Sequence, residues 1–128
     1  MRTRQRHNYQ PGDVVIVAAV PYPDGSGAKT RPSVVVSTPE FGDCDNNLII
    51  LRITSSPHAT CEMDVPIIDW AEAGLDKPST VRCFPATVGA NLIMRKIGTL
   101  TPHDWQEVCE AMRRAVACFG SEDTTPSP

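Results

Sequence analysis

The stretch Gly12-Asp13-Val14-Val15-Ile16-Val17-Ala18-Ala19-Val20 decides the fold class of this chain. From residue 14 to residue 20 it is an uninterrupted apolar run rich in β-branched side chains, which is typical of a buried strand. Two similar runs follow at residues 34–36 and 48–53, and the segments between them are rich in Gly, Pro, Asn and Asp, which favour turns. The sequence therefore predicts a mostly β protein made of short strands.

Length and composition agree with this prediction. The chain has 128 residues, enough for one ordinary domain, and its 12 prolines argue against a helical bundle. A net charge of −3 argues against a protein that coats nucleic acid non-specifically, although a local basic cleft remains open. No apolar run approaches the roughly 20 residues needed to cross a bilayer, and the basic start is not followed by an apolar leader. We expect a cytoplasmic protein without membrane contact.

Cysteine and histidine give no pattern of a metal site. The five cysteines form no CxxC pair, so neither a closed disulfide set nor a structural zinc site is predicted, and reduced thiols are expected. The three histidines, His7, His58 and His103, lie far apart without ligand spacing. P-loop, GxSxG and HExxH motifs are absent as well. We expect no metal and no cofactor.

Weaker patterns divide the rest of the chain. Residues 21–27 hold two prolines and two glycines and are predicted to form a long mobile loop between the first two strands. Alternation, apolar runs and turn residues predict four further elements: a strand at 62–66, a helical turn at 69–73 closed by Gly74, and strands at 79–84 and 93–100.

The most regular helical pattern comes near the end. From Thr101 the apolar residues recur every three or four positions, Thr101 can serve as N-cap, Pro102 suits the first turn and Gly120 suits a C-cap. Residues 1–10 are predicted as a flexible basic arm and residues 121–128 as a disordered tail, which leaves 11–120 as the domain. The apolar positions of the predicted helix are Trp105, Val108, Cys109, Met112, Val116 and Phe119.

Several segments, in this order, resemble the PemK/MazF family of toxins from type II toxin–antitoxin modules. They are Gly12-Asp13 at the first strand, Lys29-Thr30-Arg31-Pro32 before the second, Ile53-Thr54-Ser55 after the third, Ala73 to Arg82, and Arg95-Lys96-Ile97-Gly98. Each segment alone is weak, but their common order is fairly specific and covers approximately residues 11–119.

The resemblance implies a small SH3-like β-barrel with a C-terminal helix, usually a homodimer. It further implies a metal-independent ribonuclease that cuts single-stranded RNA at short sequences. In such enzymes the 2′-hydroxyl attacks the adjacent phosphate, which leaves a 2′,3′-cyclic phosphate and a 5′-hydroxyl. The implied partners are RNA and a short acidic antitoxin that covers the RNA groove.

Matching residue by residue, the resemblance implies a catalytic set of Arg31, Thr54, Ser55 and Arg82. Arg31 would hold the scissile phosphate with its planar guanidinium, and the hydroxyls and Arg82 would help to stabilise the anionic phosphorane. A second set is expected to contact the RNA: Lys29, Arg52, Lys77, Ser79 and Phe84.

The general base stays open. Some members have an acid two positions after the arginine that matches Arg82, but here Phe84 stands there, and two roles stay open for it: a stacking surface for a base or a core residue. Asp24, Glu62 and Asp76 are weak candidates for the base. Two alternatives therefore remain: a related barrel that binds antitoxin or nucleic acid without cleaving, and a toxin that poisons gyrase through protein contacts.

Overall fold

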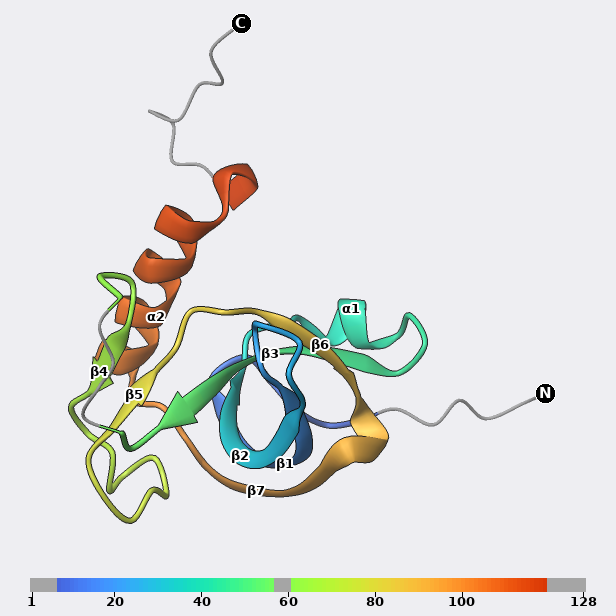
Figure 1. The fold of residues 1–128 in the computed structure, drawn as a ribbon, viewed down its shortest axis with the longest axis horizontal. Helices are drawn as coiled ribbons and strands as arrows, with labels where there is room; N and C mark the ends of the chain where they lie inside the picture. Colours follow the sequence, from blue (N-terminus) through green and yellow to red (C-terminus); the bar gives the residue numbers. More distant parts are fainter. Residues whose placement is uncertain (1–6, 57–60, 120–128) are drawn as a thin grey trace, which may run out of the picture.

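A curled antiparallel sheet followed by one long helix makes up the fold (Figure 1). The computed structural model describes residues 7–56 and 61–119. The strand order is β4-β5-β3-β2-β1-β7, and β6 pairs with β3. The elements are β1 (Asp13–Pro21), β2 (Ala28–Val35), α1 (Pro39–Gly42), β3 (Asn47–Thr54), β4 (Val65–Ile67), β5 (Ser79–Val81), β6 (Ala86–Gly89), η1 (Ala90–Leu92), β7 (Ile93–Thr99), α2 (Pro102–Ala115) and η2 (Ala117–Phe119).

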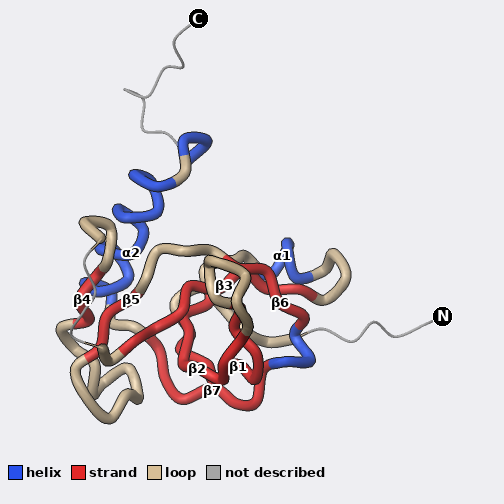
Figure 2. The backbone as a smooth tube through the Cα atoms, in the orientation of Figure 1, coloured by secondary structure: helices blue, strands red, loops and turns tan. Residues whose placement is uncertain are grey.

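Strand β3 joins the two parts of the sheet. On one side it pairs with β2, and on the other its first half pairs with β6 while its last two residues pair with β5. The short η1 leads from β6 into β7, which pairs with the far side of β1. The chain therefore curls around the β1–β2 hairpin, as Figures 1 and 2 show.

The two faces of the sheet bury two separate apolar cores. Side chains directly opposite one another in an antiparallel pair share a face, and neighbours along a strand alternate. Val14 pairs with Val34 and belongs to the core under α2, whereas Val15 faces the opposite way into the curl. The core inside the curl consists of Val15, Val17, Val20, Val35, Leu48, Ile50 and Val88.

Helix α2 covers the other face. Val108, Ala111 and Met112 are buried against the core that contains Leu51 and Ile53. Thr101 caps the helix as predicted, because its Oγ1 accepts a hydrogen bond from the Asp104 N–H at 3.4 Å. Mostly β structure with a C-terminal helix is thus confirmed.

The helix is shorter than predicted. Its α-helical part ends at Ala115, and the N–H of Val116 bonds back to the carbonyl of Met112 while the Val116 backbone becomes extended. A 3-10 turn, η2, follows. The predicted cap Gly120 and tail 121–128 lie outside the described residues.

Three strands differ most from their predicted bounds. Strand β2 begins at Ala28, before the predicted apolar run 34–36, so Arg31 lies within a hairpin strand, opposite Val17. Strand β5 ends at Val81 because the next residues turn: the Phe84 N–H donates to the Arg82 carbonyl and Pro85 follows. The strand predicted at 62–66 is shifted to β4.

Besides the short 3-10 helix η1, two elements were not predicted. Strand β6 is short and contains Ala and Gly, which are poor strand signals. Helix α1 is a single turn, yet Thr38 and Pro39 repeat the cap signature that Thr101 and Pro102 give to α2, and Thr38 Oγ1 accepts from the Phe41 N–H.

The turn at residues 69–73, which precedes β5, ends at Gly74 as predicted. Gly74 has a φ of +88°, its N–H bonds to the Ala71 carbonyl, and the Leu75 N–H bonds to the Trp70 carbonyl. These two bonds form a Schellman motif, which requires a left-handed residue at the position of Gly74. Among the described helices, none combines the length and apolar character that crossing a membrane requires.

Part of the predicted arm is described. Residues 1–6 lie outside the described residues. Tyr9 packs against the core inside the curl, and the Gln10 N–H donates to the Asp13 carboxylate at 2.8 Å.

Candidate functional site

Polar side chains continue the inner face of the sheet beyond its apolar core. Ser33 pairs with Arg52, and Thr54 pairs with Thr80. Arg31 lies two positions before Ser33, and Thr54 lies two positions after Arg52, so all five share one face. Strands β2, β3 and β5 thus present a row of guanidinium and hydroxyl groups next to the core inside the curl.

Three guanidinium groups gather on this face: Arg31, Arg52 and Arg82, here called the arginine cluster. Burial lowers the pKa of Arg52, and the nearby positive charges of Arg82 and Arg31 lower this pKa further. An arginine nevertheless stays charged at neutral pH. The cluster therefore holds like charges together, an arrangement that an anion would stabilise.

Buried hydrogen-bond donors of the arginine cluster and of the neighbouring Ser33 are unsatisfied. The Nε atoms of Arg31 and Arg52 and the Oγ of Ser33 are shielded from solvent and have no hydrogen-bond partner among the described residues. Ser33 is fully buried. Unpaired buried polar groups are costly and are uncommon away from functional sites. Ser33 was not predicted as a site residue, although its place two residues after Arg31 in the same strand was the available signal.

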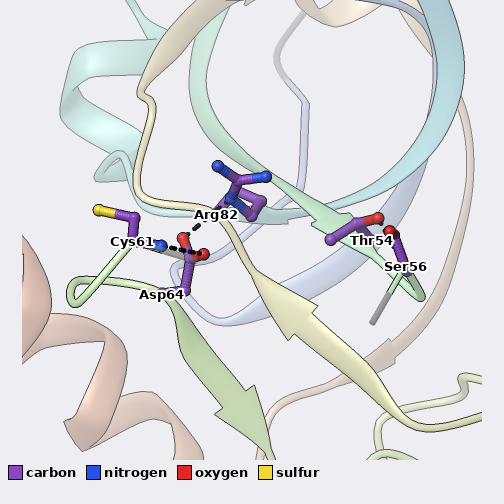
Figure 3. Close-up of polar contacts among 5 residues, drawn as sticks. All are labelled: Thr54, Ser56, Cys61, Asp64 and Arg82. Atoms are coloured by element: carbon purple, nitrogen blue, oxygen red, sulfur yellow. Dashed lines mark hydrogen bonds and ion pairs between the residues drawn. The ribbon is translucent and has the colours of Figure 1, made fainter. Parts of the chain in front are cut away.

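Arg82 is held by several contacts. Its Nε donates to Asp64 Oδ1 at 2.9 Å, and its guanidinium carbon lies 5.1 Å from the centre of the Phe84 ring. Its main-chain N–H donates to the Arg52 carbonyl. The second carboxylate oxygen of Asp64 accepts from the Cys61 N–H at 3.3 Å (Figure 3). Asp64 is the acid of this cluster, and it was not predicted from the sequence.

Thr54 closes β3 on the same face. Its Oγ1 accepts a hydrogen bond from the Ser56 N–H at 3.1 Å (Figure 3), and the neighbouring Ser55 is exposed. Tyr22, in the turn between β1 and β2, lies 5.8 Å from the guanidinium carbon of Arg31. Aromatic rings therefore lie beside two of the three arginines.

Most of the remaining predicted site residues line a pocket of about 390 Å³. Arg31 also lines it, so this residue is common to the pocket and to the arginine cluster. The structure thus separates the predicted set into two groups that meet at Arg31. The other predicted residues of the pocket are Lys29, Ser55, Lys77 and Ser79, and Arg95, which was not predicted, joins them.

The three acids considered as bases lie in different surroundings. Asp76 lines the pocket with Arg31. Asp24 is exposed in the β1–β2 turn, where hydrogen bonds from Ser26 lower the pKa of its carboxyl. Glu62 points toward α2, with a carboxylate oxygen 3.9 Å from the guanidinium of Arg114. Within residues 7–56 and 61–119, no three His, Cys, Asp or Glu are grouped to hold a metal ion.

Comparison with protein families matches residues 10–116 to the model of the PemK-like, MazF-like toxin of type II toxin–antitoxin systems. The chain belongs to the PemK/MazF family. A search of curated proteins finds no match.

Solved structures show that this PemK/MazF chain shares its fold with other toxins. A MazF-mt6 toxin of Mycobacterium tuberculosis is 24% identical, with a TM-score of 0.64 over 80% of this chain and 94% of that one. An endoribonuclease in complex with its cognate antitoxin, from a mycobacterial species, is 19% identical, with a TM-score of 0.62 over 83% and 92%. A MazF of Deinococcus radiodurans is 13% identical, with a TM-score of 0.67 over 88% and 97%.

Proposed function

We propose that this PemK/MazF-family protein is an endoribonuclease toxin that cleaves single-stranded RNA without a metal ion and acts in the cytoplasm. One observation carries the proposal: three guanidinium groups share one face of the sheet with Thr54, and the Asp64 carboxylate pairs with one of them, that of Arg82. Their net charge of about +2 suits a substrate whose negative charge grows during the reaction.

The charges favour the transition state over the ground state. A phosphodiester carries one negative charge, and the phosphorane formed by attack of the 2′-hydroxyl carries about two. Interactions that strengthen as this charge develops accelerate the reaction, whereas equal binding of both states does not. In this proposal Arg31 and Arg82 bind the non-bridging oxygens, and the Thr54 hydroxyl donates a further hydrogen bond.

The proposed partner is an acidic antitoxin. Support comes from the mycobacterial relative of the same fold, which is an endoribonuclease in complex with its cognate antitoxin. The basic groups that would bind RNA, among them Lys29, Lys77 and Arg95 of the pocket, would also attract an acidic segment. Assembly as a homodimer is part of the same proposal and follows from the family resemblance.

The test is cleavage of a long RNA by the purified chain in the presence of EDTA. We expect discrete fragments with 2′,3′-cyclic phosphate and 5′-hydroxyl ends, detected by mass spectrometry and by labelling with polynucleotide kinase. Absence of cleavage by a folded chain free of antitoxin would favour the non-cleaving alternative. Inhibition of gyrase supercoiling without RNA cleavage would favour the gyrase-poison alternative.

A further inference from the structure

Asp64 lies directly across from Arg82 in the small hairpin of β4 and β5. Val65 pairs with Val81, so the antiparallel register brings the preceding Asp64 opposite the following Arg82. The Asp64 side chain is only 6% exposed, and both of its oxygens accept hydrogen bonds, one from Arg82 Nε and one from the Cys61 N–H. A buried carboxylate with this pairing is fixed in place.

The contact with Asp64 uses one particular donor of Arg82. A guanidinium has five N–H donors, and Asp64 takes the one on Nε. Figure 3 shows the two terminal nitrogens turned away from Asp64. The Phe84 ring beside the guanidinium restrains it further. The planar pair of terminal nitrogens, which matches two phosphate oxygens, is therefore left available.

Charge makes this restraint necessary. Arg82 lies near enough to Arg52 to lower its pKa, and like charges this close repel. Without a carboxylate on its Nε, the flexible Arg82 side chain would gain by turning toward solvent. Asp64 both offsets the repulsion and sets the direction of the guanidinium.

We propose that Asp64 is a positioning residue, which holds Arg82 so that its two terminal nitrogens face an RNA phosphate. The inference rests on the proposed function. Some family members carry an acid at the position of Phe84, and in this chain Asp64 supplies the carboxylate of the site instead. Asp64 acts through Arg82 and does not itself touch the reacting atoms.

A double-mutant cycle tests this assignment. The variants are Asp64→Asn, Arg82→Ala and the double variant, each measured for kcat, for KM and for affinity to RNA with a 2′-deoxy cleavage site. We expect Asp64→Asn to lower kcat about 10- to 100-fold in the parent and to change it by less than about twofold in the Arg82→Ala background. Asp13→Asn is the matched control, because Asp13 is an equally buried carboxylate that pairs with Lys96 at 3.1 Å.

Binding gives a readout that is independent of cleavage. A positioning role predicts weaker binding of the uncleavable RNA by Asp64→Asn, whereas a role as a mere negative charge predicts tighter binding, because the variant is more positive. If the parent does not cleave RNA, the proposed function fails, and the sign of this affinity change alone decides the assignment of Asp64.

Two results would overturn the inference: tighter RNA binding by Asp64→Asn, or a loss of kcat by the same factor in both backgrounds. If Asp64→Asn does not fold, Asp64→Glu keeps the charge and displaces the carboxylate by one methylene. A positioning role then predicts a lower kcat in the parent but not in the Arg82→Ala background, and an unchanged kcat in both would overturn it.

Discussion

The carboxylate of Asp104, in the first turn of α2, accepts a hydrogen bond from the main-chain N–H of Asp69 at 2.9 Å. Its other oxygen accepts from the N–H of Ile68 at 3.1 Å. The Thr101 hydroxyl donates to the Asp69 carboxylate at 3.0 Å, so the contact works in both directions. One fully buried acid thereby attaches the helix to the turn that precedes β5.

Asp104→Ala is expected to lower the free energy of unfolding by roughly 3 to 5 kcal/mol, because it removes the charged acceptor of the Ile68 and Asp69 N–H groups, and a hydrogen bond to a charged group contributes about 1.5 to 3 kcal/mol. Urea denaturation followed by circular dichroism measures the change. Glu107→Ala, at an exposed position of the same helix, is the control and should change stability by less than about 0.5 kcal/mol. A loss below about 1 kcal/mol for Asp104→Ala would contradict this account.

Met112→Asp tests the packing of α2 on the sheet. Met112 is 7% exposed, and the variant places an unpaired carboxylate in the apolar core. We expect a loss of roughly 3 kcal/mol or more, seen as a large drop in melting temperature. Gln106→Asp, on the exposed face, is the matched control. Equal melting temperatures for the two variants would show that the buried face is assigned wrongly.

The sequence was informative wherever the structure depends on local pattern. The apolar run of β1, the cap at Thr101 and the left-handed turn at Gly74 each carry their signal within a few residues, and each was predicted. Elements without such a signal were missed: β6 becomes a strand through its pairing with β3, which lies about 40 residues earlier in the chain.

The residues of the candidate site follow the same rule: those in short local motifs were predicted, and those placed by long-range pairing were not. Arg31 and Thr54 come from a family resemblance in short motifs, and the structure places them on one face of the sheet. Asp64 could not be found this way, because its partner Arg82 is 18 positions away and the register of β4 and β5 had not been predicted. Ser33 is a small residue of β2 whose burial depends on the two neighbouring strands, β1 and β3.

Cysteine reactivity should follow burial. Burial raises the pKa of the Cys83 thiol, and the nearby Asp64 and Cys61 raise it further, while burial also raises the pKa of Cys109. The thiolate is the reactive form, so at pH 8 iodoacetamide should label the exposed Cys44 and Cys61 well before Cys83. Mass spectrometry of peptides over time gives the rates.

The raised pKa of the Cys83 thiol also links the stability of the fold to pH. A thiol whose pKa is higher in the folded state than in the unfolded state favours folding only while it is protonated. Its contribution is complete below the unfolded value of about 8.5 and is lost as the pH rises through the folded pKa.

Labelling of Cys83 as fast as that of Cys44 in the folded protein would contradict the burial of this thiol.

Arg31→Ala should lower the rate of RNA cleavage by roughly a hundred- to a thousand-fold, the usual loss when a main donor to a developing anion is removed. Arg113→Ala is the control, since Arg113 is exposed on α2 and pairs only with Glu110 among the described residues. Initial rates on a short RNA that contains one cleavage site give both values. Unchanged cleavage by Arg31→Ala would mean that the site lies elsewhere.

RNA and antitoxin should compete for the same basic surface. Phosphates and an acidic peptide both gain from the charges of Arg31, Arg52 and Lys77, and RNA affinity should fall steeply with salt as counterions are released. A segment that orders on binding loses conformational entropy, so tight inhibition also requires apolar contact. The measurement is a titration of the proposed acidic antitoxin into a complex of this chain with labelled, uncleavable RNA. We expect the RNA to be displaced as the protein binds, because one surface cannot neutralise two polyanions at once. Binding of both together, with RNA affinity unchanged, would rule out the shared surface and leave inhibition to a site away from the arginine cluster.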